Sequence, residues 1–165
     1  MHSRPTVSRA ETPAPLERHP HWRPALLLLV FLGGMVGTLC RYWLEGVVPR
    51  PLGLPLPTLA INLVGAFLLG LLLEALLRSG PDRGKRRSAR LLLGTGLLGG
   101  FTTYSTFAIE AVGLGIDGDL GWAALYVGIS VMGGILLSFA GIAAASALHR
   151  RRASRPRPHQ GGARP

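Results

Sequence analysis

The chain has 165 residues, with 18 Lys and Arg against 8 Asp and Glu, so its formal net charge is +10. It is nevertheless 48% apolar, and its mean hydropathy is +0.34. The apolar residues lie in long uncharged runs, and arginines cluster between those runs. This separation excludes an ordinary globular domain and predicts an all-α integral membrane protein.

Four apolar runs predict four transmembrane helices. Each run has about 20 residues or slightly more, which is enough to cross roughly 30 Å of hydrocarbon as a helix. In chain order the predicted spans are residues 25–44, 58–77, 91–115 and 122–148. A proline-rich connector over 49–57 and a charged loop over 78–90 separate the first three spans. Repeated proline in the connector disfavours a regular helix there.

The positions of the basic residues predict the orientation of the chain. Sixteen of the 18 Lys and Arg lie in 1–24, in the loop over 78–90 or in 149–165, and only Arg41 and Arg50 lie at the opposite face. Basic residues remain on the cytoplasmic side of a cell membrane, so both ends of the chain are predicted to be cytoplasmic. The composition of 1–24 and 149–165 predicts disordered basic tails around a membrane domain over 25–148.

Several classes of protein are disfavoured by what the chain lacks. Its one cysteine, Cys40, excludes an intramolecular disulfide framework, and none of the five His lies inside an apolar run. We predict no removable signal peptide, because the start of the chain lacks the required pattern. The spans leave little room for a catalytic domain, so we do not expect an enzyme.

The third span has a polar centre. Residues 99–106 read GGFTTYST, where glycine weakens a helix and hydroxyl groups compete for backbone hydrogen bonds. This composition favours a break near the midplane, which would present free carbonyls to cations and free N–H groups to anions. The alternative is that Gly96 and Gly100 form a GxxxG face for helix packing. We give the two interpretations similar weight.

Polar side chains inside the spans are candidate functional groups. Glu110 shares a helical face with Thr103 and Phe107, and either it is functional or it reaches the membrane interface. Asn62 lies deep in its span, where an unpaired amide would cost roughly a few kcal/mol. It therefore needs either an ion path or an inter-helix partner. Arg41 is most simply a span-end residue whose head group reaches water.

Three motifs in chain order resemble the Fluc (CrcB) family of fluoride channels. They are residues 33–42 (GGMVGTLCRY), 58–67 (TLAINLVGAF) and 99–110 (GGFTTYSTFAIE). The resemblance covers about residues 25–148 and leaves both tails unmatched. It implies a four-span protein, with a broken third helix, that forms an antiparallel dual-topology dimer and exports fluoride passively, which lowers fluoride toxicity.

The resemblance also implies roles for particular residues. Backbone carbonyls of Gly99 and Thr102 would hold a structural Na⁺ at the dimer centre. Two ring positions would be Phe107 and Tyr104, the second of which replaces the usual Phe. The remaining positions along the implied fluoride path are polar: Asn62, Thr103, Ser105, Thr106, Glu110, Tyr126 and Ser130. Gly134 stands where the family often has a hydroxyl group.

The strong charge bias disfavours an antiparallel dimer of identical chains. We therefore predict a heterodimer with an oppositely oriented homologue in the lipid bilayer. One alternative function is a small four-helix proton-coupled multidrug exporter, but such exporters use a carboxylate in the first span, and 25–44 contains none. Another is a membrane-anchored module whose basic tails bind nucleic acid or anionic lipid. The orientation rule already explains those tails, so we expect no nucleic-acid partner.

Overall fold

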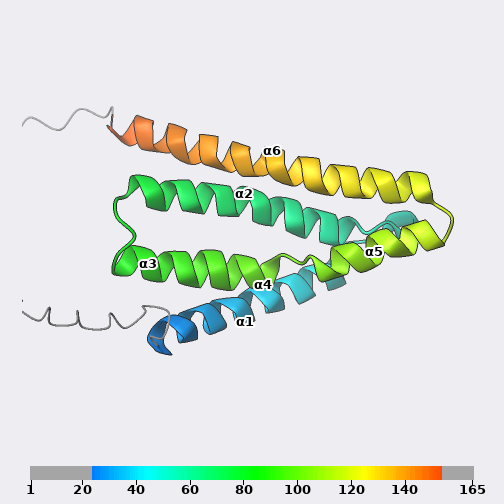
Figure 1. Ribbon diagram of the computed structural model, residues 1–165, viewed down its shortest axis with the longest axis horizontal. Coiled ribbons are helices and arrows are strands. Elements are labelled where there is room, and N and C mark those ends of the chain that lie inside the picture. The colour runs from blue at the N-terminus through cyan, green and yellow to red at the C-terminus, as the bar shows by residue number, and fades with distance from the viewer. Residues whose placement is uncertain (1–23, 154–165) are drawn as a thin grey trace, which may run out of the picture.

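The computed structural model describes residues 24–153, apart from the side chains of Leu52, Arg152 and Ala153, and all regular structure in this range is helical. Three helices are long and apolar enough to cross a membrane: α1 (Pro24–Val47), α2 (Leu56–Arg78) and α6 (Leu120–Ala153). They run side by side along the long axis of the molecule (Figure 1). The predicted all-α membrane architecture is therefore confirmed for these three spans.

The predicted third span is divided into pieces. The helix α3 (Lys85–Ala89), the π-helix η3 (Arg90–Leu98) and the short helix α4 (Gly99–Phe101) follow one another directly, and α5 (Ser105–Ile116) comes after a gap. Thr102 has extended backbone, with φ −78° and ψ 157°. The predicted break is thus confirmed and lies within the polar stretch over 99–106. It follows Phe101, whereas the glycines at 99 and 100 remain helical.

Two helix ends differ from the predicted ones because charged residues extend the helices. The helix α1 continues past residue 44 to Val47 and therefore includes Glu45. The helix α6 continues through 149–153, a segment that we predicted to be disordered. Basic side chains do not oppose helix formation where water solvates them, so the end of the apolar run is not the end of the helix. The other residues of the two predicted tails lie outside the described residues.

The two connecting segments contain short helices. In the proline-rich connector, Pro51–Gly53 form one 3₁₀ turn, labelled η2. The helix α2 then begins with a proline in its first turn, where the missing N–H is not needed. In the loop predicted over 78–90, α3 already begins at Lys85, so the charged loop is shorter than expected.

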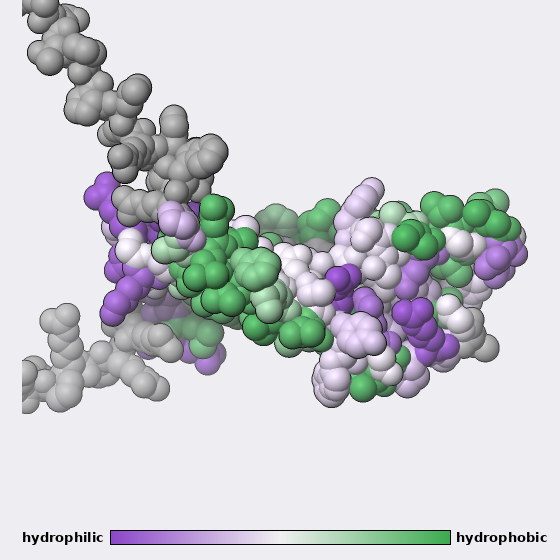
Figure 2. All heavy atoms as spheres, turned by 90° about the horizontal axis from the view of Figure 1, so that it is seen from below, coloured by the Kyte–Doolittle hydropathy of each residue, from purple (hydrophilic) through white to green (hydrophobic). Residues whose placement is uncertain are grey.

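The outer surface of the helices is largely apolar. Phe31 and Leu39 on α1 are 63% and 64% exposed, and Leu136 and Phe139 on α6 are 65% and 66% exposed. Such a surface is unsuited to water and suits hydrocarbon. Hydrophilic side chains gather instead toward the two ends of the molecule (Figure 2). Both ends of the described chain lie at the end that carries α3 (Figure 1).

Glycines bring α1 and η3 into close contact. A Cβ atom at Gly33 would lie 3.1 Å from the Cα of Gly96, and a Cβ at Gly96 would lie 3.0 Å from the Cα of Gly33. A Cβ at Gly100 would lie 3.0 Å from the Cα of Gly34. The helix-packing interpretation of Gly96 and Gly100 is therefore confirmed together with the break. Small residues serve both purposes in this span.

Replacing Gly37 by alanine is expected to destabilise the protein, because the new methyl group would overlap the backbone carbonyl oxygen of Leu97. Relief requires α1 and η3 to separate, and overpacking of this kind costs about 1–3 kcal/mol. Thermal unfolding in detergent measures the effect. Gly46→Ala is the matched control on the same helix, since its methyl group would meet nothing within 4 Å. Equal unfolding temperatures for the two variants would contradict the prediction.

A second close helix pair is formed by α2 and α6. A Cβ at Gly141 would lie 2.8 Å from the backbone nitrogen of Leu71, and one at Gly70 would lie 3.0 Å from the carbonyl carbon of Ser138. The described molecule thus consists of two tightly packed pairs, α1 with η3 and α2 with α6. The break at 102–104 lies where α2 contacts the α1–η3 pair.

Candidate functional site

The break is held by the side chain of Asn62 on α2. Its Nδ2 donates a hydrogen bond of 2.9 Å to the carbonyl oxygen of Thr103, and its Oδ1 accepts one of 2.9 Å from the Thr103 N–H. Asn62 therefore supplies both hydrogen bonds that a continuous helix would have supplied to that residue. The amide thus has the polar partner that was predicted for it. This partner is the backbone of Thr103 in a neighbouring span, so Asn62 forms an inter-helix contact.

The side chain of Thr103 organises a cluster of hydroxyl groups directly after the break. Its Oγ1 lies 3.0 Å from Oγ1 of Thr106 and 3.3 Å from Oγ of Ser105. The same oxygen accepts a 3.2 Å hydrogen bond from the N–H of Thr106. Thr103 is 7% exposed, Thr106 is half-buried and Ser105 is exposed, so the cluster extends from the interior of the subunit to its surface. Three residues predicted for the site are thereby brought together.

These bonds divert two backbone donors from their usual helical acceptors. In an α-helix the N–H of residue 103 would bond the carbonyl of Gly99, and the N–H of residue 106 would bond the carbonyl of Thr102. Here the first is bonded to Asn62 and the second to the Thr103 hydroxyl. Among the described residues, no other donor replaces them at the two carbonyls. The two predicted Na⁺ ligands, the carbonyls of Gly99 and Thr102, are thus among the carbonyls that the break leaves without a helical donor.

Three aromatic rings form a row beside the hydroxyl cluster. The ring centroids of Tyr104 and Phe107 are 6.1 Å apart with the planes tilted by 45°. Those of Phe107 and Tyr126 are 5.3 Å apart and tilted by 41°. Ring edges carry partial positive charge, so the edges of a row of tilted rings can contact a small anion favourably even where no cationic side chain is present. Tyr104 is 80% exposed and Tyr126 only 6%, so the row leads from the surface into the subunit.

Glu110 lies at the inner end of this row and is held by three side chains. Oε1 accepts a 3.0 Å hydrogen bond from Oγ1 of Thr58, and Oε2 accepts one of 3.0 Å from the hydroxyl of Tyr126. A guanidinium nitrogen of Arg50 lies 3.8 Å from Oε1. The Glu110 side chain is only 15% exposed. The Glu110 carboxylate is thus bound within the subunit, close to the connector that carries Arg50.

Two of these partners were not predicted as site residues. Thr58 is fully buried and lies one turn before Asn62, so the two share a face of α2. That spacing was the available signal. Arg50 lies in the connector before η2. Its approach to Glu110 depends on the path of that connector, which no pattern in the sequence indicates.

Two further predicted residues, Ser130 and Arg41, each carry a buried polar atom without a hydrogen-bond partner. Oγ of Ser130, one turn beyond Tyr126 on α6, is buried and makes no hydrogen bond within the described chain. The same holds for Nε of Arg41 and Oε1 of Glu45, which are one turn apart on α1. The Nε of Arg41 is therefore enclosed by protein, although the residue as a whole is only half-buried.

Comparison with known proteins places the chain. A family model described as "CrcB-like protein, Camphor Resistance (CrcB)" matches residues 28–142. The chain is 51% identical over 133 residues to the fluoride-specific ion channel FluC 1 of Cutibacterium acnes, which covers 80% of this chain and 93% of the relative. It is 45% identical over 134 residues to the fluoride-specific ion channel FluC 2 of Leifsonia xyli subsp. xyli, covering 81% and 91%.

A third relative is less similar in sequence. The chain is 41% identical over 125 residues to the fluoride-specific ion channel FluC of Methanocaldococcus jannaschii, covering 75% of this chain and 97% of the relative. The matched segment includes all three sequence motifs and the break. It also includes the Glu110 cluster, by which we mean Glu110 with its partners Thr58, Tyr126 and Arg50. The chain therefore belongs to the CrcB family, as its sequence motifs predict, and is a multi-pass membrane protein.

Proposed function

We propose that this chain is a subunit of a fluoride-specific ion channel of the cell membrane, which lets cytoplasmic fluoride leave passively and so lowers its toxicity. The observation that carries the proposal is the row of ring edges and hydroxyl groups that leads from Tyr104 to Glu110. It occurs in a chain whose relatives are named fluoride-specific channels. No step in this function requires an enzyme.

The path for fluoride consists of weak donors. The edges of Tyr104 and Phe107 replace part of the hydration shell, and hydroxyl groups of Thr103, Ser105 and Thr106 lie beside them. Conduction needs successive sites that bind an ion weakly enough to release it, and a fixed cation would hold fluoride too tightly. The hydroxyl of Tyr104 adds one donor that a Phe would lack.

Asn62, Tyr126 and Ser130 extend this path within α2 and α6. Nδ2 of Asn62 has two N–H groups, and one remains after the bond to Thr103. The buried hydroxyl of Ser130 has no protein partner in the described chain and is free to donate to an anion. Beyond it, Gly134 offers no hydroxyl, so the proposed path relies on other groups at that level. The Glu110 carboxylate fixes the Tyr126 ring and does not itself bind the anion.

A structural Na⁺ fits the break. Carbonyl oxygens are suitable ligands for an alkali cation, and those of Gly99 and Thr102 are among the carbonyls left without helical donors at the break. A bound Na⁺ would supply positive charge that offsets part of the cost of an anion nearby. Two carbonyls are too few for a complete coordination shell, so a second chain would have to supply the others.

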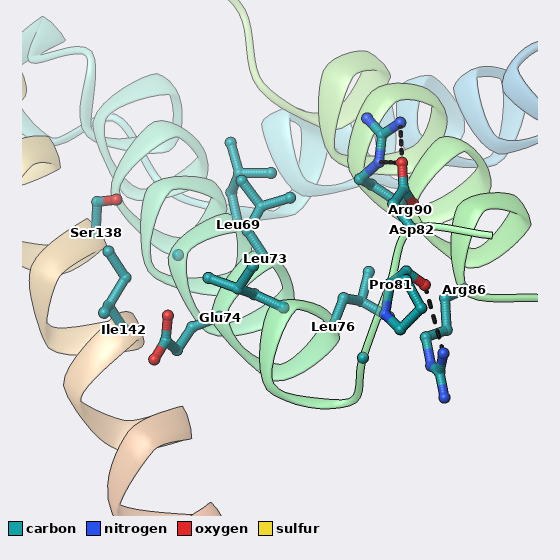
Figure 3. A pocket seen from close by; sticks show the side chains of 13 residues that line it. Leu69, Leu73, Glu74, Leu76, Pro81, Asp82, Arg86, Arg90, Ser138 and Ile142 are labelled. Carbon is teal, nitrogen blue, oxygen red and sulfur yellow. Dashed lines mark hydrogen bonds and ion pairs between the residues drawn. The ribbon is translucent and has the colours of Figure 1, made fainter.

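An antiparallel second subunit would complete the site. One face of α5 is apolar and uncovered, with Ile109, Val112 and Ile116 exposed by 73%, 60% and 78%. At one end of the molecule α5 packs against α6, whereas the other end has an open cleft of about 490 Å³ between α2, α6 and η3 (Figure 3). A two-fold rotation about an axis in the membrane plane would bring the partner's α5 into this cleft.

The charge bias argues that this partner is a different chain. Sixteen basic residues would lie on the cytoplasmic side with both ends of the chain, and an inverted copy would have to place them outside. We infer a heterodimer with a homologue whose charge bias is reversed. Each chain would then contribute to two pseudo-symmetric pores.

Growth of a fluoride-sensitive host that lacks its own fluoride exporter tests this proposal. Expression of the chain together with an oppositely biased homologue should restore growth in fluoride, and expression of either chain alone should not. Full rescue by this chain alone would contradict the heterodimer. Lack of rescue by the membrane-inserted pair would contradict the channel.

The exporter alternative has one observation in its favour. The helix α1 does include a carboxylate, Glu45, which lies in its last turn and has a buried unpartnered oxygen. A position at the end of the span is a poor one for carrying protons across the membrane. Growth of the same host in the presence of lipophilic cations tests this alternative, since an exporter would confer resistance to them.

A further inference from the structure

A polar cavity lies beside the start of α1 at the α2–α3 loop, and it shares Asp82 with the open cleft. Its volume is about 290 Å³, and its lining residues are Leu26, Asp82, Arg83, Gly84, Arg87 and Ser88. The first is the third residue of α1, and the others belong to the α2–α3 loop and to α3. The cavity therefore lies at the depth where a transmembrane helix begins, which is the level of lipid head groups.

Two arginines in this cavity have no acidic partner. Arg83 and Arg87 make no ion pair within the described part of the chain. The carboxylate in the cavity, Asp82, is already engaged, because Oδ2 lies 2.8 Å from a terminal nitrogen of Arg90 and 3.1 Å from its Nε (Figure 3). The cavity thus combines two uncompensated guanidinium groups with the hydroxyl of Ser88. This set of donors matches the oxygens of a phosphate.

An uncovered apolar surface continues from the cavity along α1. Leu27, Leu28 and Phe31 are 59%, 56% and 63% exposed. A soluble phosphate compound would make no use of this surface, whereas the acyl chains of a phospholipid would lie along it. The polar cavity therefore matches the head group of a phospholipid, and the apolar surface matches its acyl chains. The two arginines are complementary in charge to the phosphate.

We propose that this cavity binds the phosphate of an anionic phospholipid, with the acyl chains along α1. Arg83 and Arg87 contact the phosphate oxygens, and Ser88 donates a hydrogen bond to one of them. A zwitterionic choline lipid is disfavoured because its quaternary ammonium group would lie near the two guanidinium groups. The leaflet is the one at the α3 end of the molecule, and its assignment as cytoplasmic rests on the proposed orientation. Anionic lipids are attracted to basic segments at that surface.

Thermal unfolding of the full chain in a neutral detergent tests the site without any measurement of ion flux. Added phosphatidylglycerol should raise the unfolding temperature, since a ligand of the native state stabilises it, and added phosphatidylcholine should not. The double variant Arg83→Gln/Arg87→Gln should lose most of this rise. The matched control is Lys85→Gln/Arg86→Gln, which removes the same charge from the same segment outside the cavity and should retain it.

Native mass spectrometry of the same proteins counts the bound lipids and serves if a variant is destabilised for another reason. We expect retained phosphatidylglycerol on the wild-type chain and the control, and loss on the cavity variant. Equal loss from both double variants would overturn the proposal in favour of general charge attraction. An equal rise in unfolding temperature with inorganic phosphate would overturn the lipid as its source.

Discussion

Replacement of Phe107 by isoleucine is expected to abolish fluoride efflux while leaving the protein folded and assembled. The ring of Phe107 is the middle one of three, with centroids 6.1 Å from Tyr104 and 5.3 Å from Tyr126. Isoleucine preserves most of the apolar volume but has no ring edge, so an anion at this point would lose its partly positive contacts. An unsolvated anion in an apolar segment faces a large barrier. Efflux from liposomes that contain both chains measures the effect.

Phe139→Ile is the matched control for this variant. Phe139 lies on α6, is 66% exposed and belongs to the outer apolar surface. The same substitution there should leave efflux near the wild-type rate. Size-exclusion chromatography checks that both variants assemble. Retained efflux in the Phe107 variant would remove the ring-edge explanation at that position.

Asn62→Asp is expected to cause the second large loss, because it removes one hydrogen bond to the break and adds a buried charge. The carboxylate can still accept from the Thr103 N–H but cannot donate to the Thr103 carbonyl oxygen. Leaving a buried carbonyl without its donor costs about 1–3 kcal/mol, and an ionised carboxylate in the span adds to that cost. We expect lower thermal stability and loss of fluoride efflux.

The Asn62 variant also tests the proposed Na⁺ site. The wild-type pair should unfold at a higher temperature in Na⁺ than in a large organic cation, and the variant should lose this difference as the break loses its geometry. Thr38→Val is the control, since it removes only a weak 3.4 Å hydrogen bond to the Gly100 carbonyl. An unchanged Na⁺ effect in the Asn62 variant would contradict the role of Asn62 in holding the break.

Elements that depend on local composition could be predicted from the sequence. Uncharged runs of sufficient length indicated the spans of α1, α2 and α6, and a polar stretch indicated the break. The position of the break was less predictable. Gly100 packs against α1, and both Gly99 and Gly100 stay helical, whereas the interruption falls where Asn62 competes for a backbone donor. That competition is a tertiary contact and has no local signature.

The Glu110 cluster likewise has one part that the sequence indicates and one part that depends on tertiary contacts. Its carboxylate could be identified as a candidate because charge is rare inside a span. Its partners come from α2, α6 and the connector, and only their packing brings Thr58, Tyr126 and Arg50 within reach. Helical spacing places Thr58 on the face of Asn62, but no spacing rule relates either of them to Glu110. Contacts between distant segments were therefore the part that the sequence left open.

The central claim is tested most directly by ion efflux from liposomes that contain this chain and an oppositely oriented homologue. One set of liposomes is loaded with fluoride and a matched set with chloride, and an ion-selective electrode records release. We expect rapid release of fluoride and retention of chloride, because the path consists of small, weak donors. Release of both anions at the same rate, or retention of both, would contradict it.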